Sequence, residues 1–287
     1  MAFDVNRPDL TLGVIGTGAM GRGIVQVAAA GGMQVLMTDS RPGAAREALD
    51  FIEKMLSRAA EKGTLTKDQA AAAAMRIKVV GGPADMKPCH AVIEAIVENL
   101  EAKQQLFAEL EGIVAPDCIL ATNTSSLSVT TIAAKLKSPR RFAGFHFFNP
   151  VPLMKLVEVI DGLQTENWVA EALMAIGRRM TREPVRLKDA PGFLVNQVGR
   201  GYTLEAAHLA YEGVAGFADV DRVMRDVCGF RMGPFELMEL TGLDVTHPAS
   251  ELIYHQFFQE PRYRPNLIMR ARYEAGVLGR KSKRGFY

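Results

Sequence analysis

A glycine-rich turn near the start of the chain restricts its fold more than any other feature. The turn Gly16–Gly21 (GTGAMG) follows the apolar run Leu12–Ile15 and precedes Ile24–Ala30, a small, apolar stretch that suits a helix packed on a sheet. A second apolar run, Gln34–Thr38, ends at Asp39, 18 residues after the last glycine of the turn. Strand, turn, helix and strand within about 30 residues form a βαβ unit. In that context the G-x-G-x-x-G spacing predicts a dinucleotide-binding fold.

The turn and the acidic residue after it predict how a dinucleotide is held. Gly16 allows a tight turn, Gly18 lets a pyrophosphate approach backbone N–H groups, and Gly21 lets helix and strand pack closely. The helix N-terminus favours the phosphate charge. Asp39 can accept hydrogen bonds from ribose hydroxyls and repels the 2′-phosphate of NADP, which favours NAD. Arg41 is able to accommodate that phosphate, which weakens the preference without reversing it, and a turn that serves packing alone stays open as an alternative.

Strand-like and helical patterns alternate through the first two thirds of the chain. The further apolar runs are Ile77–Val80, Ala91–Ala95, Cys118–Ala121, Phe142–Phe145, Leu156–Ile160 and Val185–Leu187. Helical patterns at Leu100–Val114 and Asn167–Met180 lie between some of them. This alternation predicts an α/β fold, a Rossmann-like, largely parallel, doubly wound sheet. The Ala-rich segment from about 42 to 75, with Thr66 as an internal N-cap, predicts a helical hairpin inserted into that sheet.

The pattern changes at Asp189–Gly192. Beyond that point the sequence is helical almost throughout, with expected helices at Phe193–Glu212, Phe217–Cys228, Phe235–Leu240 and Ala249–Phe258. We therefore expect two domains, an α/β domain at 1–188 and an all-α domain at 189–287.

Composition excludes several classes of protein. Hydrophobic residues make up 48% and charged residues 23% of the chain, the balance of an ordinary globular protein. Lys and Arg number 34 against 32 Asp and Glu, which gives no basic field for nucleic acid. No apolar run approaches the roughly 18 residues of a membrane span, and the first residues lack a secretory signal, so we expect a cytoplasmic protein. Cys89, Cys118 and Cys228 lack metal or disulfide spacing and are expected to be buried, and no metal is expected.

A histidine and a polar turn follow expected strands, where the sites of α/β proteins lie. His146 comes at the end of one such strand and Asn123–Ser126 directly after another. A histidine can take the proton of a hydroxyl while hydride leaves the same carbon, and a carboxylate such as Glu158 can fix its tautomer. Spacing alone does not show that Glu158 reaches His146, and a structural role for the histidine stays open.

Several motifs in order resemble the L-3-hydroxyacyl-CoA dehydrogenase family, in particular its single-function members related to 3-hydroxybutyryl-CoA dehydrogenase. The resemblance covers nearly the whole chain and is strongest at Gly16–Gly21, Val92–Leu100 (VIEAIVENL), Asn123–Ser126, His146–Ile160, Pro191–Asn196 (PGFLVN), Met232–Glu236 (MGPFE) and Gly279–Tyr287 (GRKSKRGFY). It implies interconversion of (3S)-3-hydroxyacyl-CoA and 3-oxoacyl-CoA with hydride transfer to NAD, in fatty-acid metabolism such as β-oxidation. It also implies a substrate and dimerisation role for the second domain, within a homodimer.

The resemblance implies a role for each matching residue. His146 is the general base, Glu158 orients it, and Ser125 and Asn196 hold the substrate oxygen. The implied cofactor contacts are Gly16, Thr17, Gly18, Ala19, Met20, Gly21, Asp39, Glu98, Lys103, Ser125, Asn149 and Lys281. Lys62 and Ser125 are the implied contacts to coenzyme A. Without the family, Glu98 and Lys103 are typical of a solvated surface pair.

Some positions depart from the family pattern. Lys54, Arg58 and Lys62 share one helix face, but only Lys62 matches a family contact, and Met55 stands where the family usually has a serine. The other departures lie in the second domain, at Gln197, Gly199, Gly201 and Lys283. They leave the catalytic motifs intact and leave the acyl chain open.

Two other functions stay open. One is an NAD-dependent dehydrogenase of another hydroxy acid, such as a sugar acid, as in crystallin-like relatives. The other is a non-catalytic NAD-binding protein. A sugar-acid enzyme does not require the CoA face around Lys62, and a non-catalytic protein does not require His146, Glu158, Ser125 and Asn196 together.

Overall fold

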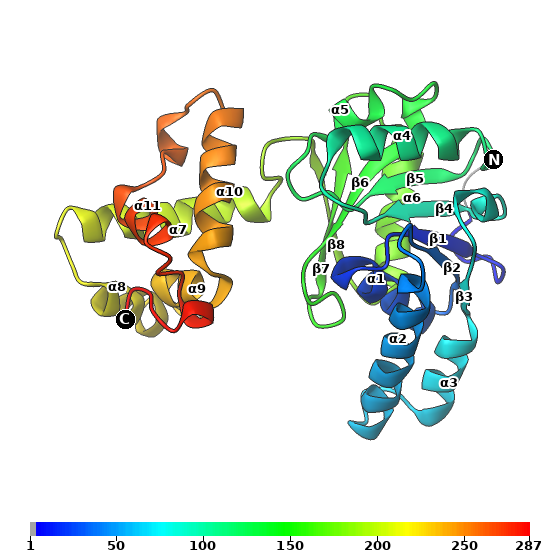
Figure 1. Cartoon of the computed structure of the whole chain (residues 1–287), viewed down its shortest axis with the longest axis horizontal. Helices are drawn as coiled ribbons and strands as arrows, with labels where there is room; N and C mark the ends of the chain where they lie inside the picture. Colours follow the sequence, from blue (N-terminus) through cyan, green and yellow to red (C-terminus); the bar gives the residue numbers. More distant parts are fainter. Residues whose placement is uncertain (1–3) are drawn as a thin grey trace. The chain divides into compact units, whose positions relative to one another are not determined.

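The computed structural model describes residues 4–287, and the chain divides into two compact units, Met1–Phe193 and Leu194–Tyr287 (Figure 1). The first unit includes Asp189–Phe193, which we assigned to the second domain from the sequence. Hydrogen bonds explain this placement, because the Asp189 carboxylate accepts from Ser128 Oγ at 2.7 Å and from the Thr130 N–H at 2.8 Å.

The first unit is built on one eight-stranded sheet with the order β3-β2-β1-β4-β5-β6-β7-β8. All neighbouring strands are parallel except β6 and β7, which are antiparallel. The strands are β1 Thr11–Ile15, β2 Gln34–Thr38, β3 Ile77–Val79, β4 Ala91–Glu94, β5 Ile119–Thr122, β6 Phe142–Phe147, β7 Leu156–Asp161 and β8 Glu183–Lys188. The expected Rossmann-like sheet is confirmed. Strands β2 and β3 lie on one side of β1, and strands β4 to β8 follow in order on its other side.

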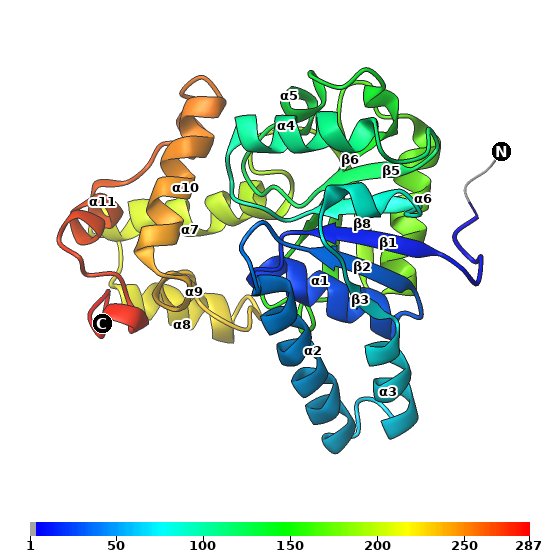
Figure 2. The ribbon, with the colours of Figure 1, turned by 45° about the vertical axis from the view of Figure 1, so that its right-hand side comes forward.

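Helices cover both faces of the sheet, as a doubly wound fold requires (Figure 2). One core contains buried residues of α1 (Ala19–Ala30) and α6 (Asn167–Arg179) with residues of the strands. The other contains residues of α4 (Leu100–Glu111) and α5 (Val129–Ala133). Short 3₁₀ turns at Pro83–Met86 and Pro139–Arg141 complete the unit.

The inserted helical hairpin is confirmed as α2 (Ala44–Glu61) and α3 (Lys67–Met75). Thr66 begins the second helix with a capping box, because its hydroxyl accepts from the Gln69 N–H and the Gln69 side chain accepts from the Thr66 N–H. Leu49, Ile52 and Leu56 are buried on the inner face of α2. The outer face is thereby left to charged residues.

The second unit is helical, as expected. It consists of α7 Val195–Tyr211, α8 Phe217–Asp226, α9 Pro234–Thr241, α10 Leu243–Gln256 and α11 Leu267–Glu274, with 3₁₀ turns at Pro261–Tyr263 and Arg280–Ser282. Its core contains a triangle of aromatic rings, Phe217, Phe235 and Phe286, with centroids 4.8 to 5.1 Å apart.

Burial of the cysteines agrees with the sequence at two of three positions. Cys89 and Cys118 are buried, and burial raises the pKa of each thiol to about 12. The expectation is wrong for Cys228, which is exposed because it lies just beyond the end of α8. In the described part of the chain, no helix combines the length and apolar character that crossing a membrane needs.

Candidate active site

The glycine turn joins β1 to α1, and its three glycines have different surroundings. Gly16 has a φ of +92°, and a Cβ there would lie 2.5 Å from the carbonyl oxygen of Ala95. A Cβ on Gly21 would lie 1.8 Å from the carbonyl oxygen of Gly16, so this glycine allows the helix to pack on the turn. A Cβ on Gly18 would meet nothing within 4 Å beyond its chain neighbours in the described part of the chain. Space for a ligand therefore lies beside the second glycine.

The N-terminus of α1 has the properties of an anion site. Gly18 is its N-cap and supplies no side-chain hydrogen bond to the first turn, which also contains no acidic residue. The first backbone N–H groups of a helix lack intrahelical partners, and the helix dipole favours negative charge there. These groups suit the pyrophosphate of a dinucleotide.

Asp39, directly after β2, is bound to the same turn. Its Oδ2 accepts from the Thr17 N–H at 2.7 Å and from Thr17 Oγ1 at 2.9 Å, and its Oδ1 accepts from the Arg41 N–H at 2.9 Å. Burial opposes ionisation, but the hydrogen bonds outweigh it and lower the pKa of Asp39. The Arg41 guanidinium instead pairs with Glu47 at 2.6 Å. The ionised carboxylate of Asp39 therefore lies beside the glycine turn, where the sequence predicts contact with ribose hydroxyls.

We expect Asp39→Ala to narrow the preference for NAD over NADP. A carboxylate at this position of a dinucleotide-binding fold accepts hydrogen bonds from ribose hydroxyls and repels a 2′-phosphate. Loss of a charged hydrogen bond of about 1.5–3 kcal/mol corresponds to about 10–100-fold in kcat/KM for NAD. Steady-state kinetics with both cofactors measure the ratio, with Asp39→Asn as a variant of matched size and Arg41→Met as a control. A wild-type preference for NADPH contradicts this role and assigns the discrimination to Arg41.

His146 and Glu158 form a buried pair that the sheet itself creates. In the antiparallel β6–β7 pair they are direct cross-strand partners, so their side chains lie on the same face. His146 Nδ1 lies 2.7 Å from Glu158 Oε2, and the two residues are 5% and 0% exposed. In the tautomer in which Nδ1 donates to this carboxylate, Nε2 has the lone pair and is the ring atom able to accept a proton. Glu158 therefore fixes the orientation of the His146 ring.

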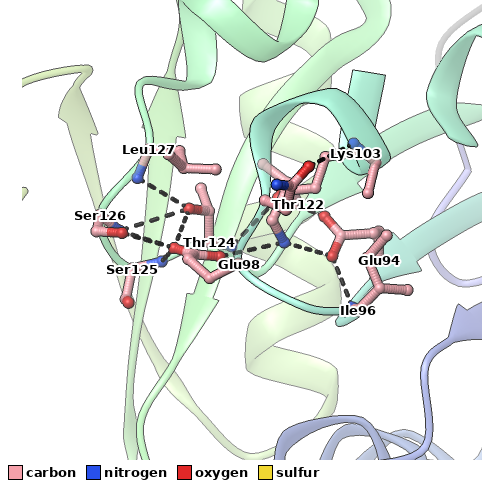
Figure 3. Close-up of polar contacts among 11 residues, drawn as sticks. Glu94, Ile96, Glu98, Lys103, Thr122, Thr124, Ser125, Ser126 and Leu127 are labelled. Atoms are coloured by element: carbon pink, nitrogen blue, oxygen red, sulfur yellow. Dashed lines mark hydrogen bonds and ion pairs between the residues drawn. The ribbon is translucent and has the colours of Figure 1, made fainter. Parts of the chain in front are cut away.

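The loop after β5 is bound to Glu98 and to the strand of the histidine. Glu98 Oε1 accepts from Thr124 Oγ1 at 2.6 Å, from Ser126 Oγ at 2.9 Å, and from the N–H groups of Ser125 and Ser126 at 3.0 and 3.1 Å (Figure 3). Asn123 Oδ1 accepts from the Phe147 N–H at 2.9 Å, next to His146. Burial opposes ionisation of Glu98, but the bond from Thr124 and the charge of Lys103 outweigh it and lower its pKa.

Lys103 is buried, which excludes the interpretation of a solvated surface pair for this side chain. Its side chain is 1% exposed, and its Nζ lies 2.5 Å from Glu94 Oε1 and 3.3 Å from Glu98 Oε2. Glu94 was not identified from the sequence. The sequence feature that could have identified it is a carboxylate inside the apolar run that forms β4. A charge buried in a strand needs a partner, so this position predicts a nearby cation.

The other predicted residues lie in two separate places. Asn149 follows β6 and Lys62 is the C-cap of α2, and both are exposed in the first unit. Asn196 lies in the first turn of α7, and Lys281 pairs with Asp244 at 2.8 Å, both within the second unit.

Most predicted site residues of the first unit lie at one edge of the sheet. At the carboxyl ends of the parallel strands β1, β2, β4, β5 and β6 lie the glycine turn, Asp39, Glu98, the 123–126 loop and His146. Among residues 4–287, no group of three or more His, Cys, Asp or Glu side chains is placed to hold a metal ion.

Family models match both units. The model described as 3-hydroxyacyl-CoA dehydrogenase, NAD binding domain, matches residues 11–190, and the C-terminal domain of the same family matches residues 192–287.

Individual relatives agree with this match. The chain is 42% identical to 3-hydroxyadipyl-CoA dehydrogenase of Escherichia coli over 96% of its own length but only 58% of the relative's. It is also 42% identical to a probable 3-hydroxybutyryl-CoA dehydrogenase of Bacillus subtilis, over 96% of this chain and 95% of the relative. The solved structure of (S)-3-hydroxybutyryl-CoA dehydrogenase from Ralstonia eutropha has a TM-score of 0.92 and 39% identity, with 96% and 98% of the two chains covered. The chain belongs to the 3-hydroxyacyl-CoA dehydrogenase family, and its first unit is the NAD-binding domain of that family.

Proposed function

We propose that the protein interconverts (3S)-3-hydroxyacyl-CoA and 3-oxoacyl-CoA with NAD, with His146 as the general base. The observation that carries this proposal is the pairing of His146 with Glu158 across β6 and β7, at 2.7 Å and out of contact with bulk water. A buried, oriented imidazole at the carboxyl ends of the strands suits removal of a proton from an alcohol.

In the oxidation direction, His146 Nε2 takes the proton of the C3 hydroxyl. The C3–H bond breaks, its electron pair leaves as hydride, and the C3–O bond becomes a carbonyl. NAD, when bound, supplies the acceptor for the hydride. Glu158 stabilises the imidazolium that forms, because its carboxylate accepts a hydrogen bond from the Nδ1–H group of the ring and carries the opposite charge. In the reduction direction the same imidazolium returns the proton to the oxygen.

We assign the holding of the substrate oxygen to Ser125 and Asn196, in agreement with the family motifs that both residues match. Ser125 is exposed at the surface of the first unit, and its N–H is bound to Glu98. Asn196 comes from the second unit, to which we assign the substrate and dimerisation role. Val198, two residues further along α7, is 66% exposed, as expected for a residue covered by a second copy. A monomeric mass at micromolar concentration contradicts the dimer.

We expect Lys62→Met to raise the KM for acyl-CoA without changing the Kd for NADH. Lys62 is exposed at the end of α2, so its contact to a CoA phosphate contributes about 1 kcal/mol, or about fivefold in KM. The effect should weaken as salt rises. Lys54→Met removes a charge from the same helix face and is the matched control. For a pantetheine substrate without the nucleotide, the KM of Lys62→Met should equal that of the wild type. An increase in this KM as large as that for acyl-CoA contradicts a contact between Lys62 and the CoA phosphate.

Reduction of acetoacetyl-CoA, followed by the loss of NADH absorbance, tests the proposed function. The proposal expects rapid turnover of acetoacetyl-CoA and none of sugar acids in the reverse assay with NAD. Oxidation of a sugar acid in place of acyl-CoA assigns the protein to another hydroxy acid. NADH binding without turnover of either class assigns it a non-catalytic role.

A further inference from the structure

One buried ammonium connects two carboxylates beneath the candidate active site. Lys103 Nζ lies 2.5 Å from Glu94 Oε1 and 3.3 Å from Glu98 Oε2 (Figure 3). Glu94 and Lys103 are 0% and 1% exposed, whereas the Glu98 side chain is 38% exposed. Glu94 comes from β4, and Lys103 lies in the first turn of α4. The three charged groups therefore extend from the interior of the first unit to its surface, with Glu98 as the exposed member.

Both carboxylates hold the same loop. On the inner side, Glu94 Oε2 accepts from Thr122 Oγ1 at 2.7 Å, and Thr122 Oγ1 accepts from the Thr124 N–H at 3.2 Å. On the outer side, Glu98 Oε1 binds the hydroxyl of Thr124, both N–H groups that follow, and the hydroxyl of Ser126. The loop after β5 is thus held at two levels by carboxylates that share one counter-ion.

Stability alone is a weak reason for such a pair. Removing two charges from water costs several kcal/mol per ion, and replacement of a buried ion pair by apolar residues is often neutral or stabilising. The contacts do, however, give a partner to each of the four carboxylate oxygens of Glu94 and Glu98. One of them, Glu98 Oε1, accepts from the Ser125 N–H, and Asn123 connects the same loop to Phe147, the neighbour of His146.

We propose that Glu94 and Lys103 are positioning residues that hold the loop bearing Ser125 in its place beside the strand of His146. Lys103 acts on the loop through Glu98 and, by way of Glu94, through Thr122. The inference rests on the proposed function, because it assigns the two residues an effect on the chemical step. It also gives a function to Glu94, which the motifs alone left without one.

Lys103→Met tests the shared counter-ion. Without the ammonium, the buried carboxylate of Glu94 and the partly exposed carboxylate of Glu98 lose their shared counter-ion and repel each other, and we expect the loop to move. We expect kcat at saturating NADH and acetoacetyl-CoA to fall by about 10²-fold, the effect of a displacement of about 1 Å at a reacting centre. Because kcat is measured at saturating NADH, it does not depend on any change in the Kd for NADH. A Kd raised tenfold or more with unchanged kcat instead makes Lys103 a cofactor contact and overturns the inference.

A double-mutant cycle distinguishes positioning from general damage to the fold. We expect Lys103→Met to have little further effect on kcat in a Ser125→Ala background, because residues that act as a unit are not additive. Losses that multiply in the double variant overturn the inference.

Thr122 provides a test that leaves every charge in place. Thr122→Val removes only the hydroxyl between Glu94 and Thr124, whereas Thr122→Ser keeps it. We expect kcat to fall about tenfold in the valine variant, about the effect of one hydrogen bond, with recovery in the serine variant. This comparison stands even where Lys103→Met fails to fold. An active wild type with equal valine and serine variants overturns the inference alone. A wild type that does not reduce acetoacetyl-CoA overturns the proposed function, and the inference with it.

Discussion

We expect His146→Ala to lower kcat for 3-hydroxyacyl-CoA oxidation by about 10²–10⁴-fold, the usual contribution of a general base. The variant should still bind NADH with a Kd near the wild-type value, since the ring belongs to the sheet and not to the glycine turn. Burst and steady-state measurements of NADH formation give kcat, and fluorescence titration gives the Kd. A wild-type kcat in the His146→Ala variant contradicts a role as general base and indicates a structural role for His146.

Glu158→Gln should also reduce kcat, because it keeps the size of the side chain but removes the charge that stabilises imidazolium. The double variant should be little slower than His146→Ala alone, since the two side chains act as one unit. Losses that multiply would show that Glu158 acts elsewhere, for example in folding. Thermal unfolding of all three variants serves as the control, because both residues are buried.

Alanine should have different effects at the two glycines beside the start of α1. We expect Gly21→Ala to reduce stability and Gly18→Ala to reduce NAD affinity. Gly21→Ala places a methyl group 1.8 Å from the Gly16 carbonyl oxygen, so the helix or the turn must shift. We expect this overpacking to destabilise the protein by about 3 kcal/mol or more. Chemical denaturation measures the loss as a change in the free energy of unfolding.

Gly18→Ala is the matched control for that change. Gly18 has a φ of −61°, which alanine adopts without strain, and a Cβ there meets nothing within 4 Å beyond its chain neighbours in the described residues. The loss in stability should stay below about 1 kcal/mol, the effect of a weaker N-cap. NAD affinity should fall about 10–100-fold, as expected when charged hydrogen bonds to a phosphate are lost. Unchanged affinity would place the pyrophosphate away from this turn.

The sequence predicts those features whose determinants lie within a few residues. The glycine turn, the strand that ends at Asp39 and the Thr66 cap each depend on neighbours in the chain, and the structure has all three. Alternating apolar runs were enough to predict the sheet and the helices on its faces. An expected helix that began at Ala249 instead begins at Leu243, because a helix can include Pro248 with the loss of one hydrogen bond.

Contacts between distant segments could not be predicted in the same way. His146 reaches Glu158 because β7 runs antiparallel to β6 and places the two residues in register. The sequence indicated a largely parallel sheet and did not show which strands pair in antiparallel fashion. It therefore could not predict that His146 and Glu158 are cross-strand partners. The five-residue spacing of Glu98 and Lys103 likewise says nothing about burial. Lys103 is buried because α4 packs on β4, where Glu94 provides a counter-ion.

We propose above that hydride moves between NAD and C3 of an acyl-CoA, with proton transfer by His146. The most direct measurement uses NADH with deuterium at both C4 positions and acetoacetyl-CoA as substrate, with analysis of the product by mass spectrometry and NMR. The account predicts (3S)-3-hydroxybutyryl-CoA with one deuterium at C3, formed by His146→Ala about 10²–10⁴-fold more slowly than by the wild type. Consumption of NADH without deuterium at C3, or no acyl-CoA product while NADH still binds, would contradict it.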